Sequence, residues 1–335
     1  MKPSKNLVYL LFILLFLYSG CCKKSTSTDL NKDKAFNISY ESKSKLPDCY
    51  ELDSILRDFD IELVDCPAGT FMMGSPADEV GRDKKDEFQH QVTITKPYRI
   101  GKYEITLDQF EKITGRSLIK KEGDNEAFKF IDNRKKSNDE DLNIIFNKKV
   151  IPCICTCNEA NEFCQKLNIR FSEYIPKNYH FDLPTEAQWE YACRAGTTTA
   201  FNNGKNISSI DPNERKWFDS ECVELNDIAW YGFNSRVKKN GKDFGYKIKP
   251  IGTKKNNDWG IYDMHGNVPE YCKDRYGPYS SKNNVDPYID RGGPPVIRGG
   301  GFNLTSKNCR SASRKSAPSF DFPAAGFRIV LVSND

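Results

Sequence analysis

Short apolar runs separated by turn residues are the feature that most limits what this chain can fold into. From about Ile61 to Val332, glycine, asparagine, aromatic residues and short apolar runs alternate at short intervals, without an internal repeat or a break in composition. Such spacing is typical of short strands with many connections. We therefore expect one α+β domain over residues 61–335, with few helices and much irregular backbone. The charged stretch Lys120–Lys149 predicts a surface insertion within it.

Three capping boxes predict where helices begin. In this motif a threonine hydroxyl accepts a hydrogen bond from the third residue onward, whose Glu or Gln side chain accepts one in return. The threonines are Thr106, Thr156 and Thr185. Apolar residues at helical spacing follow the first two, and Gly196 is the expected end of the third helix. Strands are predicted at residues 91–100, 150–156, 294–300 and 326–332.

The first 60 residues differ in character from the rest. A basic start precedes an unbroken apolar run, Leu7–Tyr18, of about 12 residues. This run is too short to cross a bilayer, which takes about 20 residues. A serine and a glycine then lead directly to Cys21, as in the processing site of bacterial lipoproteins. We interpret residues 1–20 as a lipoprotein-type signal peptide. Residues 21–60 would hold the lipidated cysteine and a flexible polar tether.

The expected location is a bacterial membrane, with the domain facing the periplasm or the cell exterior and bound to lipid through Cys21. Because Tyr18 departs from the small aliphatic residue usual at its position, a plain cleaved signal and an uncleaved anchor remain alternatives. Export permits disulfides. The chain has 12 cysteines. Lipid on Cys21 leaves an odd number, so at least one thiol would be free or bonded to another chain.

Composition excludes several classes of partner. The chain carries 50 basic and 46 acidic residues, a net charge of +4, which is too balanced to indicate nucleic-acid binding. The mean hydropathy of −0.65 is not that of a membrane-embedded protein. The three glycines at 299–301 are not followed by a helical pattern, so they do not form a phosphate-binding loop and no nucleotide is expected.

Seven motifs occur in a fixed order along the chain. They are PAGTFMMGS (67–75), YRIGKYEITLDQF (98–110), LPTEAQWEYACRAG (183–196), GIYDMHGNVPEY (260–271), VIRGGGF (296–302), CRSASR (309–314) and GFRIV (326–330). Together they resemble the formylglycine-generating enzyme, or sulfatase-modifying factor, family. The resemblance covers Ile61–Val332 and implies the family's version of the C-type-lectin-like fold. Active members of the family oxidise a cysteine of a sulfatase to formylglycine, with O2 and a copper ion held by two cysteines.

The stretch YDMHGNVPE is a candidate calcium site. Two carboxylates with a glycine between them suit Ca2+, which takes six to eight oxygen ligands. By resemblance, the ligands would be the side chains of Asp263 and Glu270 and the backbone carbonyls of Gly266 and Val268. Two solvated carboxylates on a turn are the alternative. Asp243 is a weaker candidate for a second calcium site.

The copper site is incomplete by the same resemblance. Cys309 matches one of the two copper cysteines, but Leu304 stands at the position of the other. A serine and a tryptophan that shape the family's pocket are replaced by Gly301 and Pro269. Copper is therefore not expected, since Cu(I) requires soft thiolate donors. A disulfide between Cys193 and Cys309 is an open alternative for the remaining thiol.

Other residues do not supply a replacement metal centre with comparable support. Cys153, Cys155 and Cys157 alternate with other residues, so on a strand they would share one face. Core packing and soft-metal binding are both open for these three. The histidines His90, His180 and His265 are far apart in the sequence, unlike the histidine cluster of related iron-dependent sulfoxide synthases.

Two functions from different classes follow. The first is an exported lipoprotein whose domain binds a protein or glycan partner, chiefly through residues 301–326, with calcium as structural support. The second is an oxidoreductase of the formylglycine-generating type that acts on a protein cysteine with O2. One candidate copper thiolate in place of two favours the first, and whether the chain is an enzyme stays open.

Overall fold

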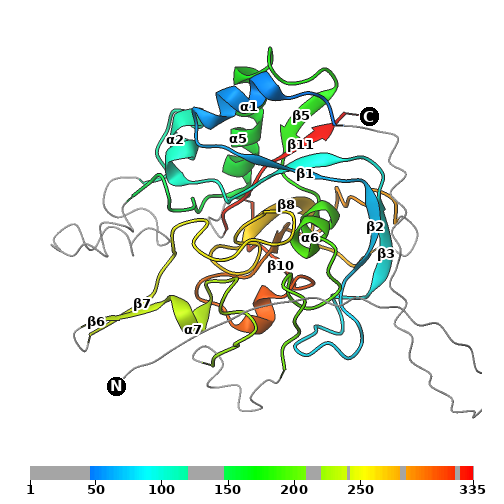
Figure 1. Cartoon of the computed structure of the whole chain (residues 1–335), viewed down its shortest axis with the longest axis vertical. Helices are drawn as coiled ribbons and strands as arrows, with labels where there is room; N and C mark the ends of the chain where they lie inside the picture. The colour runs from blue at the N-terminus through cyan, green and yellow to red at the C-terminus, as the bar shows by residue number, and fades with distance from the viewer. Residues whose placement is uncertain are drawn as a thin grey trace, which may run out of the picture. The chain divides into compact units, whose positions relative to one another are not determined.

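Within the described residues, the domain consists of four small sheets and a few short helices, joined by long irregular segments (Figure 1). The computed structural model describes residues 46–119, 147–208, 220–239, 242–279, 284–320 and 325–334. The predicted signal peptide, Cys21, most of the tether and most of the insertion at 120–149 lie outside these residues. None of the helices within them has both the length and the apolar character that a bilayer crossing needs.

The largest sheet brings together the two ends of the described chain. Its order is β1-β4-β11-β5, with every neighbour antiparallel. The C-terminal strand β11 lies in its interior, so the sheet closes only when the last residues are in place. Its strands are β1 (Leu63–Cys66), β4 (Tyr98–Gly101), β11 (Val330–Ser333) and β5 (Tyr179–Asp182).

Three helices, α1 (Tyr50–Arg57), α2 (Leu107–Thr114) and α5 (Cys157–Arg170), gather at one end of the domain beside this sheet (Figure 1). Their core includes a row of rings, in which Phe163 lies 6.0 Å from Phe110 and 5.3 Å from Phe327 between ring centroids. Burying each ring stabilises the fold by about 2 kcal/mol or more.

The three predicted capping boxes are confirmed. Thr106, Thr156 and Thr185 begin α2, α5 and α6 (Glu186–Arg194), each with both reciprocal hydrogen bonds. The third helix ends just before Gly196. There Ala195 already takes a left-handed backbone with φ 45° and Gly196 continues it with φ 94°.

Three strand predictions were wrong in extent. Residues 91–100 form two strands in different sheets, β3 (His90–Ile94) and β4, because the chain turns away at Pro97, which cannot donate to a ladder. Residues 150–156 form no strand. They make single bridges, in which Cys153 N–H donates to Ile105 O and Cys155 N–H donates to Ala325 O. The predicted C-terminal strand begins only at Val330.

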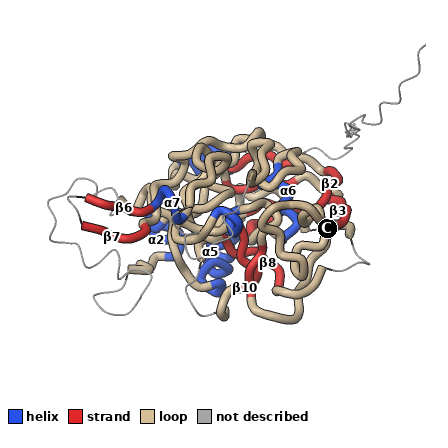
Figure 2. The backbone as a smooth tube through the Cα atoms, turned by 90° about the horizontal axis from the view of Figure 1, so that it is seen from below, coloured by secondary structure: helices blue, strands red, loops and turns tan. Residues whose placement is uncertain are grey.

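The remaining sheets lie at different sides of the domain. In Figure 2, β6 and β7 project on one side, and β2 and β3 lie on the opposite side. β2 pairs with β3, β6 with β7, and β9 lies between β10 and β8. The elements are β2 (Gly69–Met73), α7 (Gly232–Ser235), β6 (Arg236–Lys239), β7 (Lys242–Tyr246), β8 (Glu270–Arg275), β9 (Pro295–Arg298), the 3-10 turn η2 (Ser306–Cys309) and β10 (Arg314–Ser316).

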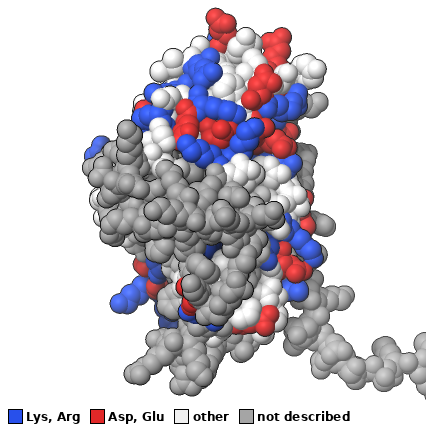
Figure 3. Space-filling model, turned by 90° about the vertical axis from the view of Figure 1, so that its left-hand side faces the viewer, with Lys and Arg blue, Asp and Glu red and all other residues white. Residues whose placement is uncertain are grey.

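Surface charge is mixed where the helices gather. Basic and acidic side chains intermingle over the end of the domain that holds α1, α2 and α5 (Figure 3). Ion pairs such as Lys112–Asp108 at 2.7 Å and Lys148–Glu111 at 2.8 Å account for part of this pattern. These exposed pairs stabilise the fold little.

Candidate functional site

The segment that resembles the family's copper end places Cys309 inside a closed apolar core. Cys309 ends η2 and is fully buried, in a cluster that includes Phe201, Leu225 and Tyr231. Burial raises the pKa of the Cys309 thiol to about 12. Because the thiolate is the form that binds metals, this environment disfavours metal ligation by Cys309.

Leu304 is half-buried, and its backbone is fixed on both sides. Its N–H donates to Gly301 O at 3.0 Å, and its carbonyl accepts from Gly232 N at 2.7 Å. Gly301 lies against the ring of Pro269, where an added Cβ would come within 3.1 Å of the proline Cδ. Pro269 and Gly301, the two departures from the family pattern, are therefore compatible with each other. A serine side chain at position 301 would crowd the proline ring, whereas glycine does not.

A polar cluster lies behind Cys309. His265 Nδ1 donates to the Cys309 carbonyl at 2.6 Å, so its Nε2 is free to accept from Asn202 N at 3.1 Å. Burial lowers the pKa of His265 to about 4, which keeps the ring neutral. Cys193 Sγ lies 3.8 Å from this Nε2 and 3.7 Å from Ser311 Oγ.

Cys193 and Cys309, for which a disulfide was an alternative, are not bonded to each other. Both thiols are free, and Cys193 instead contacts His265 and Ser311. The ten cysteines within the described residues are all free and buried. They pack as small apolar side chains, a frequent role for buried cysteine.

Cys153, Cys155 and Cys157 also belong to the apolar core. Cys157 is the first residue of α5, so the three do not lie along one strand. Within the part of the chain that the structure describes, no three or more His, Cys, Asp or Glu side chains are grouped to hold a metal. His90 lies on β3, and His180 on β5 lies 3.6 Å from Asp182.

The predicted calcium loop is held in a conformation that glycine and short polar residues permit. Asp263, Gly266 and Asn267 all have positive φ, of 57°, 79° and 51°. An added Cβ at Gly266 would lie 2.1 Å from the Trp230 carbonyl, so only glycine fits there. This geometry places Asp263 and Glu270 in the interior, both almost fully buried.

Three buried carboxylates meet one guanidinium at this loop. Glu270 binds Arg328 through Nε at 2.7 Å and Nη2 at 2.6 Å, and accepts from Trp189 Nε1 at 2.8 Å. Glu104, which the sequence reasoning missed, accepts from Asn267 Nδ2 at 2.7 Å and from Val268 N at 3.1 Å. Burial and the charges of the other two carboxylates raise the pKa of Glu104 well above its usual range.

One carboxylate of the predicted loop has an oxygen that is free to bind a cation. Asp263 Oδ2 accepts from Gly252 N at 2.6 Å, whereas its Oδ1 is buried and has no hydrogen-bond partner among the described residues. Burial raises the pKa of Asp263 to about 6. An orphaned carboxylate oxygen and an excess of buried negative charge are what Ca2+ would satisfy. Glu270 departs from the expectation because Arg328 already occupies both of its oxygens.

Asp243 lies on β7, on an exposed hairpin. Its carboxylate pairs with Arg236 and accepts from Gly245 N at 2.9 Å. The guanidinium lowers the pKa of Asp243, together with the backbone donor. The carboxylate is thus engaged by this chain's own groups, and nothing on the hairpin favours a second calcium there.

Buried ion pairs, unforeseen from the sequence, tie the motifs together. Arg298 on β9 donates to Glu190 and lies 3.2 Å from Glu186, both on α6. Arg314 binds Glu186 at 2.6 and 2.7 Å. Arg310 binds a further pair of buried glutamates at the loop after β2. The sequence shows only that the three arginines, and the two glutamates on α6, fall within the seven motifs.

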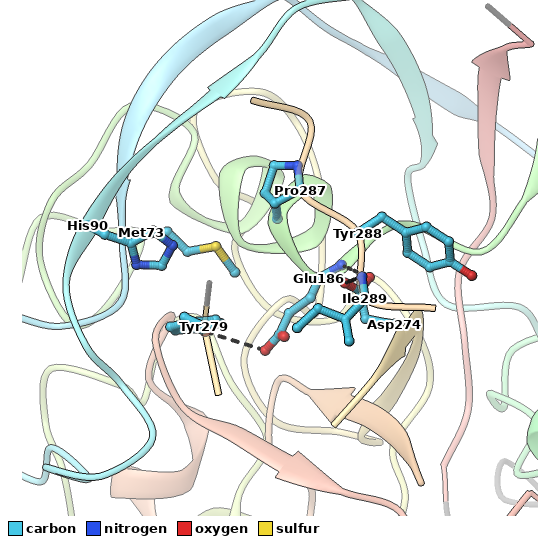
Figure 4. A pocket seen from close by; sticks show the side chains of 9 residues that line it. Met73, His90, Glu186, Asp274, Tyr279, Pro287, Tyr288 and Ile289 are labelled. Carbon is cyan, nitrogen blue, oxygen red and sulfur yellow. Dashed lines mark hydrogen bonds between the residues drawn. The ribbon is translucent and has the colours of Figure 1, made fainter. Parts of the chain in front are cut away.

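A hollow opens where β2, β3, α6 and β8 approach one another (Figure 4). Its wall residues come from segments far apart in the sequence, and Asp274 lies at its base. Burial, then the charge of Glu186, raises the pKa of Asp274 to about 7. The lining residues are Met73, His90, Glu186, Ala187, Asp274, Tyr279, Pro287, Tyr288 and Ile289.

The chain is similar in sequence to a known domain family and to several characterised proteins. A profile described as "Sulfatase-modifying factor enzyme 1-like domain" matches residues 60–332. "Chaperone protein LppX" of Paenibacillus barcinonensis is 32% identical over 114 residues, which cover 31% of this chain and 35% of that protein. The "Formylglycine-generating enzyme" of Streptomyces coelicolor is 31% identical over 156 residues, or 44% and 45%. The chain thus aligns with less than half the length of these curated relatives.

Two solved structures share the fold. PvdO of Pseudomonas aeruginosa has a TM-score of 0.57 and 26% identity over 80% of this chain and 93% of that one. Variable protein 1 of Treponema denticola has a TM-score of 0.56 and 22% identity over 81% and 94%, a likeness of fold alone. Since the profile spans most of the chain and the expected fold is present, this protein belongs to the sulfatase-modifying factor, or formylglycine-generating enzyme-like, domain family.

Proposed function

We propose that this protein is an exported lipoprotein whose domain binds a partner and does not carry out the copper oxidase chemistry of the family. The observation that carries the proposal is the surroundings of Cys309. Its thiol is fully buried in an apolar cluster, and the position of the second copper cysteine holds Leu304. Cu(I) binds tightly between two soft donors, and one buried thiol does not supply them.

The neighbouring substitutions support the same proposal. Gly301 packs on Pro269 where the family has serine and tryptophan, so the pocket that surrounds the copper is reshaped and not merely short of one ligand. The name of one relative, "Chaperone protein LppX", fits a binding role for this domain family. The proposed partner is a protein or a glycan that contacts loops within residues 301–326. Residues 321–324 of this range lie outside the described structure.

Calcium is proposed as structural support for the domain. Asp263 and Glu270, with the carbonyls of Gly266 and Val268, would hold the ion, and Glu104 would add negative charge beside it. When bound, calcium neutralises buried carboxylates that one arginine leaves in excess. The loop that carries these residues leads into β8, so the ion would fix the middle of the domain.

The membrane attachment is part of the same proposal. The short apolar run that ends before Cys21 favours lipidation of that cysteine, and the polar tether would hold the domain away from the membrane. The domain would then face the periplasm or the cell exterior of a bacterium.

The alternative function is an oxidoreductase of the formylglycine-generating type. The identity with the Streptomyces coelicolor enzyme favours it. The test is to incubate the purified protein with Cu(I), O2 and a sulfatase-type peptide, and to follow loss of the cysteine sulfur by mass spectrometry. The binding proposal predicts no conversion above a copper-only control. Oxygen-dependent turnover by the wild-type protein would overturn it in favour of the oxidase.

A further inference from the structure

Exposed apolar side chains lie next to the lining residues of the hollow. Three of the nine large apolar side chains that are exposed within the described residues lie just before β3 and on the loop 284–289. The Phe88 ring stacks on His90, and Val285 bridges to Thr93 of β3, so the loop and the hairpin adjoin. The three are Phe88 at 63%, Val285 at 54% and Tyr288 at 44% exposed.

The walls of the hollow are apolar and aromatic. Met73 points inward from β2 on the side where His90 and Tyr279 lie, and Pro287 and Ile289 complete the opposite side (Figure 4). The rings of His90 and Tyr279 are 4.8 Å apart between centroids. Such walls accept an aliphatic chain, because burying its methylene groups releases water from both surfaces.

The base of the hollow holds a carboxylate that no basic side chain neutralises by contact. Asp274 is 3% exposed, and backbone N–H groups of Ile289 at 3.0 Å and Glu186 at 2.8 Å each donate to one of its oxygens. Within the described residues it forms no ion pair. Glu186 differs, since Arg314 and Arg298 occupy its oxygens. Asp274 is thus held in place with acceptor capacity left over.

We propose that this hollow binds a lysine side chain presented by a polypeptide partner, with the ammonium group at Asp274 and the aliphatic stem along the Met73 wall. Lysine combines an apolar stem with a compact group of three donors, which matches an apolar passage that ends in a carboxylate. Opposite charge at the base gives the specificity. The apolar rim extends beyond one side chain, so the partner is a polypeptide and not a free amine.

Other occupants match less of the site. A sugar needs several hydrogen-bonding side chains, whereas Phe88 and Val285 beside the hollow offer none and Glu186 is already saturated by arginines. An anion would meet the carboxylate of Asp274. An uncharged aliphatic side chain would fill the walls and leave the remaining acceptor positions of the buried Asp274 carboxyl group without a donor, which is unfavourable.

This inference rests on the proposed binding role, and its test separates the two. The probes are acetyl-Ala-Leu-Lys-Leu-Ala-amide and the same peptide with norleucine for lysine, titrated into the full chain and followed by NMR. We expect the lysine peptide to bind at least tenfold more tightly and to shift resonances of the hollow. Equal binding of both peptides, or shifts elsewhere only, would overturn the inference. Oxidase activity would sink the proposed function and leave this comparison unaffected.

Matched variants sharpen the result. Asp274→Asn keeps the shape and removes the charge, so the preference for lysine over norleucine should disappear. Phe88→Ala changes only an exposed rim residue and should weaken both peptides, which keeps the test valid even if the first variant is poorly folded. Ile169→Ala, which removes an even more exposed apolar side chain from α5, should change neither. A lysine preference that survives Asp274→Asn, or a null effect of Phe88→Ala, would contradict the assignment.

Discussion

Removal of calcium should lower the melting temperature of the domain, and this effect should depend on Asp263. A ligand that binds only the folded state stabilises it by about 2.7 kcal/mol at a hundredfold excess over its Kd. For a domain of this size, each kcal/mol shifts the melting temperature by roughly 2–4 °C. We therefore expect wild-type protein to melt about 5–10 °C higher in excess calcium than in chelator.

Asp263→Ala should close that gap. The orphaned Oδ1 is lost with the side chain, and the loop keeps too few oxygen donors to compete for the ion. The variant also loses the acceptor for Gly252 N, which lowers stability under both conditions by about 1–3 kcal/mol. The informative quantity is consequently the difference between calcium and chelator within each variant.

Scanning calorimetry of matched samples measures this difference. Asp243→Ala is the control, because that exposed carboxylate pairs with Arg236 and should leave the calcium-dependent gap unchanged. Identical melting curves in calcium and chelator for the wild-type protein would refute the reasoning. In that case protons, and not calcium, would balance the buried carboxylates.

Three further outcomes are expected. Cys21→Ser should move the membrane-expressed protein from the detergent phase to the aqueous phase in a partition assay, and a variant that stays in detergent would indicate another anchor. Arg310→Ala leaves two carboxylates buried without their partner and should lower the free energy of unfolding by about 3–5 kcal/mol, whereas exposed Lys315→Ala should change it by less than about 0.5 kcal/mol. Asp274 holds its proton longer when folded, so its contribution to stability falls as pH rises from about 4 to its folded pKa of about 7. Urea unfolding should therefore give a lower free energy of unfolding at pH 8 than at pH 5, and Asp274→Asn should reduce this difference by a few kcal/mol at most. Equal pH dependence in both proteins would contradict this assignment.

Local signals in the sequence predicted the helices well. A capping box lies within four residues, so Thr106, Thr156 and Thr185 fix their helix starts without help from distant segments. The strands depend on distant partners. Residues 150–156 have the composition of a strand. In the structure their backbone makes isolated hydrogen bonds to Ile105 and Ala325 and no continuous ladder.

The candidate site was predictable in part for the same reason. The spacing of Asp263, Gly266 and Glu270 lies within one loop, and the structure keeps that loop and its glycine-only turn. Glu104 lies after β4 and Arg328 lies before β11, so no local pattern shows that they meet the loop of Asp263 and Glu270. The same holds for Asp274, whose role emerges only once β8 and the loop 284–289 are side by side.

The resemblance supplied the fold, but the structure explains the departures from it. Gly301 lies against Pro269, so the two positions at which the sequence departs from the family pattern are neighbours in the structure. Cys309 keeps its position and becomes a core residue among apolar neighbours. A cysteine that matches a family motif therefore does not by itself indicate the family's chemistry.

The most direct test of the central claim is a Cu(I) competition titration of wild-type protein and Leu304→Cys against a chromogenic chelator. Wild-type protein should take up no stoichiometric copper, because Cys309 lacks a second thiolate and is buried as a neutral thiol. Leu304→Cys restores the donor, and each tenfold gain in affinity that it brings corresponds to about 1.4 kcal/mol. Tight one-to-one binding of Cu(I) at Cys309 in the wild-type protein would contradict the account and favour the alternative function as an oxidase.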